Sequence, residues 1–95
     1  MEVKDAVRSA KRYVADLFAD EQPDEIGLEE TEYDNKEKEW RITIGFRRIL
    51  VGTNRKGALK GFPVPRAERS FKIVRIRDSD GAVLGVADRI LQDAA

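Results

Sequence analysis

Carboxylates are the side chains of this chain whose number and spacing could do chemistry. Six of them fall within eleven positions: Glu29, Glu30, Glu32, Asp34, Glu37 and Glu39. Paired carboxylates can act as general acid and base in hydrolysis, but one of them must be desolvated to shift its pKa. Alternation along a strand instead exposes many of these side chains beside Arg41 and Arg47. We therefore predict cross-strand ion pairs here.

An acidic motif near the C-terminus resembles the opening of a calcium-binding loop. It consists of Asp78, Asp80 and Gly81. A calcium loop needs a glutamate at its twelfth position, and that position, counted from Asp78, is Arg89. The Asp-Gly pair is typical of a hairpin turn, so we predict a turn rather than a metal site.

A glycine-rich stretch invites comparison with a phosphate-binding loop, whose backbone N–H groups surround an anion. Gly52 and Gly57 are followed by Ala58 and Leu59, not by the Lys-Ser or Lys-Thr pair of that motif. The chain also has no cysteine and no histidine, which removes thiolate chemistry and the usual proton shuttle. The sequence therefore predicts no catalytic residue, no metal and no cofactor, and the protein is expected not to be an enzyme.

Basic residues are concentrated in one part of a chain whose formal net charge is zero. Residues 41–77 carry eleven positive charges and one negative charge, whereas the first forty residues hold thirteen acidic and six basic groups. Such segregation either pairs neighbouring strands or presents a basic surface to an anionic partner. The candidate partner- or anion-binding residues are Arg47, Arg48, Arg55, Lys56, Lys60, Phe62, Arg66 and Arg69.

Two functions are compatible with this basic region. The first is a non-catalytic module that binds or regulates another protein, as a charged loop on a rigid scaffold would allow. The alternative is an electrostatic nucleic-acid-binding domain that uses residues 47–69, with Phe62 stacking on bases. The zero net charge and the isoelectric point near 6.3 favour the first function, since dedicated nucleic-acid binders are commonly basic overall.

The elements that position these residues follow from hydrophobic periodicity. Apolar residues recur every three or four positions over residues 3–20, which predicts an amphipathic helix that ends before Pro23. From there the period changes to two, and residues 26–51 predict an antiparallel hairpin. Its second strand alternates from Trp40, a core-edge anchor, to Phe46, and its apolar half should face the helix.

The rest of the chain predicts a second hairpin. Residues 52–69 read as a long basic loop, residues 70–87 as a hairpin, and residues 88–95 as a short turn that Asp88 caps. At 95 residues the chain forms a single domain. The predicted class is α+β, with an N-terminal helix packed on a curved four-stranded antiparallel sheet made of two hairpins.

The segments 40–44 and 70–83, in this order of elements, resemble the PepSY-like modules. These are small cystatin-like domains in which a helix packs on a curved antiparallel sheet, and gas-vesicle accessory proteins share a similar layout. The resemblance covers nearly the whole chain at the level of layout. It implies a non-catalytic role in which the domain inhibits or regulates a partner, and it supplies no catalytic residue.

Partner and location are expected from simpler features. The longest apolar runs are three residues, so no membrane span is predicted, and the charged first residues lack a signal-peptide pattern. A cytoplasmic location is therefore expected. Phe71 and Ile73 share one face of their strand while Val74 and Ile76 share the other. The extra apolar face is compatible with cover by the long loop, with a partner patch or with a homodimer.

Overall fold

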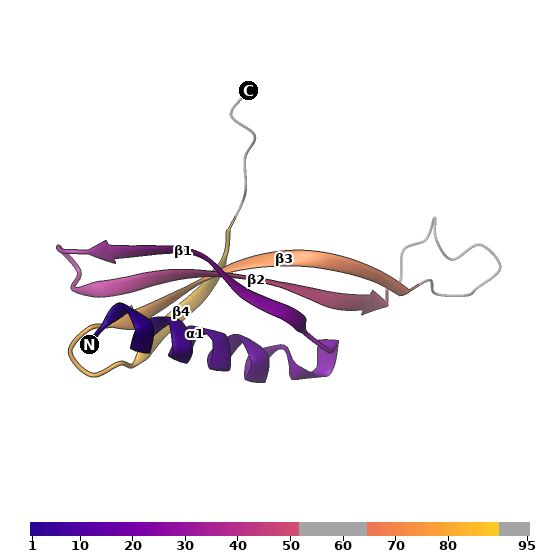
Figure 1. Cartoon of the computed structure of the whole chain (residues 1–95), viewed down its shortest axis with the longest axis horizontal. Helices are drawn as coiled ribbons and strands as arrows, with labels where there is room; N and C mark the ends of the chain where they lie inside the picture. Colours follow the sequence, from indigo (N-terminus) through magenta and orange to yellow (C-terminus); the bar gives the residue numbers. More distant parts are fainter. Residues whose placement is uncertain (52–64, 90–95) are drawn as a thin grey trace, which may run out of the picture.

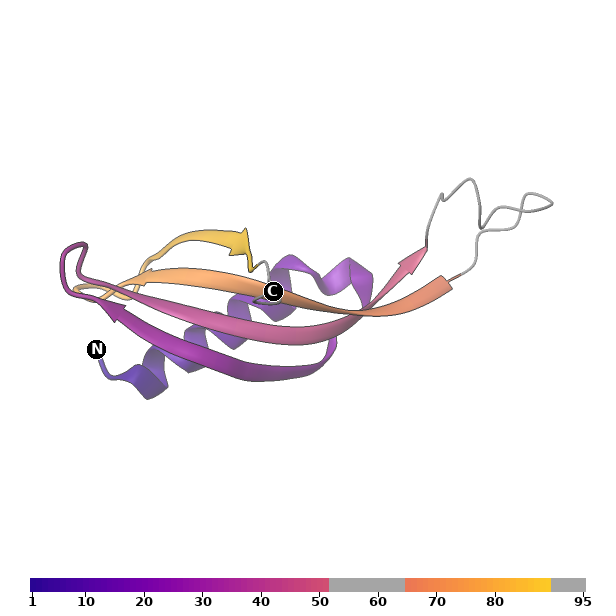
Figure 2. The same ribbon diagram turned by 90° about the horizontal axis from the view of Figure 1, so that it is seen from above.

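The computed structural model describes residues 1–51 and 65–89. These residues form α1 (Val3–Leu17), the 3-10 turn η1 (Ala19–Glu21), β1 (Asp24–Asp34), β2 (Glu39–Val51), β3 (Pro65–Arg77) and β4 (Val83–Asp88). The strands make one antiparallel sheet in the order β1-β2-β3-β4, and α1 lies against one of its faces (Figures 1 and 2). The predicted class, a helix on a four-stranded antiparallel sheet, is confirmed.

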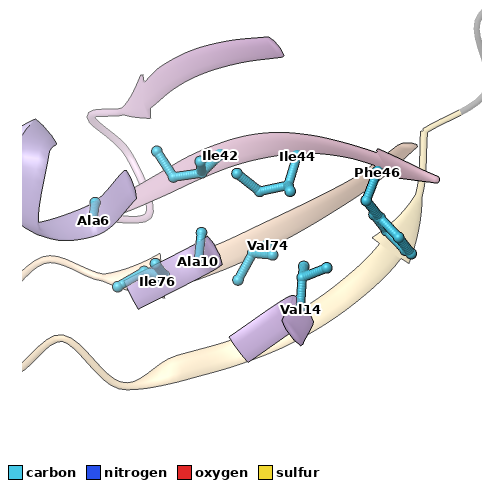
Figure 3. Close-up of a cluster of buried hydrophobic side chains, with 8 residues drawn as sticks. All are labelled: Ala6, Ala10, Val14, Ile42, Ile44, Phe46, Val74 and Ile76. Atoms are coloured by element: carbon cyan, nitrogen blue, oxygen red, sulfur yellow. The ribbon is translucent and has the colours of Figure 1, made fainter. Parts of the chain in front are cut away.

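The core lies between α1 and the two central strands. Figure 3 shows side chains from α1, β2 and β3 pointing toward one another, and all of them are fully buried. They are Ala6, Ala10 and Val14 of the helix, Ile42, Ile44 and Phe46 of β2, and Val74 and Ile76 of β3. The apolar half of β2 therefore faces the helix, as the alternation predicts. Because the helix contributes small side chains, its backbone can approach the sheet closely.

The helix is shorter than the sequence predicts. It ends at Leu17, and η1 follows instead of a last helical turn. Gln22 then adopts a left-handed conformation with φ of 51°, which stops the helical path before Pro23. The ends of the predicted apolar stripe are also outside the core, since Val3 is 37% and Leu17 is 53% exposed.

Strand β1 pairs with β2 through an irregular register. The pairing shifts between Asp24 and Gly27 and again between Leu28 and Glu30. Each bulge inserts an extra residue and so breaks the alternation of the side chains. These irregularities explain why the sequence pattern of this strand is weak. From Glu30 to Asp34 the pairing with β2 is continuous.

The predicted loop over residues 52–69 is wrong at its C-terminal end. Strand β3 begins at Pro65, and Ala67 and Arg69 pair with Ile49 and Arg47 of β2. A proline is tolerated here because it is the first residue of the strand. The sequence does not indicate a strand here because charged residues interrupt the alternation of polar and apolar residues in this stretch and in the part of β2 that pairs with it. Residues 52–64 lie outside the described residues.

The turn at the end of β3 is the predicted hairpin turn. Gly81 has a φ of 74° and donates its N–H to the carbonyl of Arg77 over 2.8 Å. Asp88 is the last residue of β4, and its carboxylate pairs with Lys72. The turn predicted over residues 88–95 with Asp88 as its cap stays a prediction, because residues 90–95 lie outside the described residues.

Candidate functional site: a groove between the helix and the edge strand

Two of the predicted basic site residues lie on the sheet face opposite α1. Arg47 contacts Glu25 with an Nη1–Oε1 distance of 3.6 Å. Arg69 donates to Glu29 Oε1 over 2.8 Å, and its guanidinium lies 5.6 Å from the centroid of the Phe71 ring. Both arginines are thus paired with carboxylates of β1, as the sequence predicts for Arg47.

Arg48 lies on the helix side of the sheet and closes one end of the core. Its Nη1 donates to both carboxylate oxygens of Glu21, at 3.0 and 3.1 Å, and its Nε donates to Ser70 Oγ over 2.9 Å. The guanidinium also stacks over Phe18 and Phe46, with centroid distances of 5.2 and 5.9 Å. These contacts assign Arg48 a structural role.

The other predicted site residues fall into two groups. Arg66 lies on β3 opposite Leu50. Arg55, Lys56, Lys60 and Phe62 lie outside the described residues. The structure therefore does not bring the eight predicted residues together into one site, and it separates Arg48 from Arg47 and Arg69 by the thickness of the sheet.

Acidic residues of β1 and β2 pair with arginines on the sheet face opposite α1. Glu39 is only 1% exposed and accepts hydrogen bonds from Arg75 Nε at 2.8 Å, Arg75 Nη2 at 3.0 Å and Arg41 Nε at 3.3 Å. The hydrogen bonds from Arg75 hold the pKa of the Glu39 carboxyl below its usual range. Glu30 similarly contacts Arg89 over 3.3 Å. The predicted ion pairing is thus confirmed for five of the six acidic residues, Glu29, Glu30, Glu32, Asp34 and Glu39.

Asp78 and Asp80 are engaged within the protein rather than with a metal site. Asp78 accepts hydrogen bonds from Trp40 Nε1 at 3.1 Å and from the Tyr33 hydroxyl at 3.4 Å. The indole hydrogen bond lowers the pKa of Asp78. Asp80 accepts from the backbone N–H of Ala82 and from Arg77, both over 3.0 Å. Within residues 1–51 and 65–89, no cluster of side chains with metal-ligand chemistry occurs.

A hollow on the described surface lies between α1 and β1. It has a volume of about 460 Å³ and is lined by three apolar residues, three cations and one threonine. These residues, which we call the α1–β1 groove, are Val3, Lys4, Val7, Arg8, Lys11, Leu28 and Thr31. The groove is open to solvent, and Leu28 within it remains 45% exposed.

The electrostatics of the groove differ from those of the sheet face. Within the described part of the chain, Lys4 and Lys11 have no carboxylate partner, and Arg8 contacts only Asp5, at 3.6 Å between exposed groups. An exposed pair at that distance neutralises little of the positive potential. Within the described residues, the groove therefore combines an apolar floor with two unpaired lysines and one weakly paired arginine.

Sequence reasoning missed this groove, although two signals for it exist. Lys4, Arg8 and Lys11 recur at helical spacing beside the apolar stripe, which places them on one side of α1. Leu28 is an apolar residue in a strand with little periodicity. Neither signal by itself identifies a groove. The groove forms where β1 lies next to α1, and the register of the sheet determines that position.

No family model, curated protein or solved structure matches the chain. The resemblance to PepSY-like modules therefore stays a prediction. Among the described residues, no helix is long and apolar enough to span a membrane.

Proposed function

We propose that this protein is a non-catalytic protein-interaction module that holds a segment of its partner in the α1–β1 groove. The observation that carries the proposal is the apolar floor of exposed Val3, exposed Leu28 and partly buried Val7, which three cations border. Burial of such side chains is worth about 25 cal/mol per Å² of apolar surface, so a partner gains from covering them.

The charges of the groove define the chemistry of that partner. Lys4, Arg8 and Lys11 border the apolar floor and are available to carboxylates. Complementary charge at an interface contributes mainly to specificity and to the rate of association. The preferred segment therefore carries apolar side chains together with aspartate or glutamate.

The carboxylates elsewhere in the described chain support a binding role rather than acid–base catalysis. Glu39, the most enclosed of them, is held in its ionised form by Arg75 and Arg41. A general acid needs the opposite tuning, a pKa raised toward the working pH.

Selection from a displayed library of random twelve-residue peptides tests this function. We expect the immobilised protein to enrich peptides that combine apolar and acidic residues. The dissociation constant of the tightest peptide should rise about tenfold or more in Leu28→Glu and in Lys11→Glu. The matched control is Arg12→Glu, because Arg12 lies on the same helix outside the groove and undergoes the same charge change.

Two results would contradict the proposal. One is a library from which no groove-dependent peptide is enriched. The other is an equal loss of affinity in the Arg12 control, which would indicate a general charge effect. A parallel titration with oligonucleotides at about 50 and 200 mM salt separates nucleic-acid binding, whose affinity falls steeply with salt.

A further inference from the structure

The α1–β1 groove lies along an edge of the sheet. Strand β1 pairs with β2 on one side, and among the described residues no strand pairs with its other side. Figure 2 shows β1 at one edge of the sheet and β4 at the other, with α1 on one face. An edge strand of this kind presents alternate N–H and C=O groups to an incoming chain.

Resting on the proposed function, we infer that the partner segment is extended and adds to β1 as a fifth strand. The continuous pairing of Glu30 to Asp34 with β2 provides a regular edge, whereas both register shifts lie earlier in the strand. Strand addition uses backbone hydrogen bonds for affinity and alternate side chains for specificity.

One set of alternate side chains would enter the groove. Leu28 and Thr31 pair with Ile44 and Ile42, whose side chains face α1, so both lie on the helix side of the sheet. A strand beside β1 projects every second side chain to this same side. Those side chains would meet Val7 and the groove cations, which select apolar and acidic residues.

The other set of side chains would meet acidic residues. Glu30 and Glu32 pair with Thr43 and Arg41 and lie on the face opposite α1. Their side chains are 49% and 57% exposed, although each contacts an arginine. A neighbouring strand with basic or neutral residues on that side is favoured, since like charges on adjacent strands destabilise pairing.

This two-sided pattern also argues against a second copy of the chain as the occupant. An antiparallel pairing of two β1 edges would place Glu30 and Glu32 of one copy beside the same residues of the other. The expected partner is a different protein. Its segment alternates apolar or acidic residues with basic or neutral ones.

The test uses the tightest peptide from the library and a series of its single N-methylated forms. N-methylation removes one backbone donor and leaves the side chain unchanged. Strand addition predicts an alternation along the peptide: about tenfold weaker binding at every second position and little change between them. On binding, hydrogen exchange should also slow at the β1 amides of residues 30–34 that face outward.

The outcomes separate the inference from the proposed function. Groove-dependent binding without the two-residue alternation, or without slower exchange in residues 30–34, overturns strand addition and leaves the groove function standing. A bound helix would instead lose affinity wherever methylation breaks its internal hydrogen bonds. A library with no groove-dependent peptide overturns both.

Discussion

At the scale of single residues, Glu39 is a carboxylate that is buried without a second layer of the described structure above it. It lies on the face of β2 opposite α1, where none of the described elements packs, yet it is 1% exposed. Arg75 and Arg41 enclose its carboxylate and satisfy it with three hydrogen bonds. The arginines remain about half exposed themselves, with side-chain exposures of 46% and 38%. The enclosure is therefore made by long side chains rather than by a core.

The depressed pKa of Glu39 makes stability depend on pH in a defined direction. The unfolded chain binds the proton more readily than the folded chain, so this contribution is present at neutral pH. It is lost as the pH falls below the usual glutamate value of about 4.3 toward the lower folded value.

We expect Glu39→Gln to lower the free energy of unfolding by about 1–2 kcal/mol at neutral pH. The difference from the unsubstituted protein should shrink as the pH falls through that window. Urea unfolding followed by fluorescence of Trp40, the only tryptophan in the sequence, measures both. Glu37→Gln, in the exposed turn, is the control. A gap that is independent of pH would contradict the assignment.

At the scale of elements, Gly45 lets two strands that are not neighbours contact each other. It lies on β2 between β1 and β3, and the Glu29–Arg69 ion pair crosses directly above it. A Cβ atom at this position would lie 2.6 Å from Glu29 Oε1 and 2.8 Å from Arg69 Nη2. Any side chain at this position must therefore displace the pair.

Gly45→Ala should consequently have opposite effects in two backgrounds. In the unsubstituted protein the lost pair and the displaced side chains lower stability, by about 0.5–1 kcal/mol. In a Glu29→Ala/Arg69→Ala background the same change should stabilise, because alanine is better than glycine in a strand interior. Denaturant unfolding of the four variants forms a double-mutant cycle. Additive effects would show that the pair does not depend on Gly45.

At the scale of the whole molecule, folding brings the basic central segment of the sequence into contact with the acidic N-terminal segment. Arginines of β2 and β3 pair with carboxylates of η1 and β1, which come from the acidic first forty residues. Among the described residues, Lys4 and Lys11 of the groove have no carboxylate partner, and Arg8 contacts only Asp5 of the same helix. The cations that we propose for partner binding are thus on the helix, not on the described part of the basic block.

A substitution of Arg48 tests whether the arginines of the sheet stabilise the fold while the groove cations bind the partner. We expect Arg48→Gln to lower the free energy of unfolding by about 1–3 kcal/mol, because it loses the two hydrogen bonds to Glu21 and the stacking on Phe18. The affinity of the groove peptide should not change. Denaturant unfolding and peptide titration measure the two effects, with Arg12→Gln as the control. Unchanged stability together with weaker oligonucleotide binding would favour the nucleic-acid alternative.

Parts of this result follow from sequence because they depend on local pattern. The alternation of Ile42, Ile44 and Phe46 predicts the buried side of β2, and Asp80-Gly81 predicts the last turn. The sequence predicts a loop at Arg69, whereas the structure places this residue on β3, because a strand rich in charges shows no alternation of polar and apolar residues. Its strand exists through pairing with β2, which is a nonlocal contact.

The sequence by itself determined the fold class, the helix side of the central strand and the pairing of acidic with basic segments. Hydrophobic periodicity predicts the fold class and the buried side of the strand because it is a local property of a few residues. Charge predicts the pairing of the two segments because Coulomb attraction acts over a distance. Only the tertiary structure decided that β3 begins at Pro65, that Arg48 closes the core, and that Val3 and Leu28 line one groove. Those features depend on strand register and on where α1 crosses the sheet. Contacts between residues that are distant in the sequence determine the register and the crossing point.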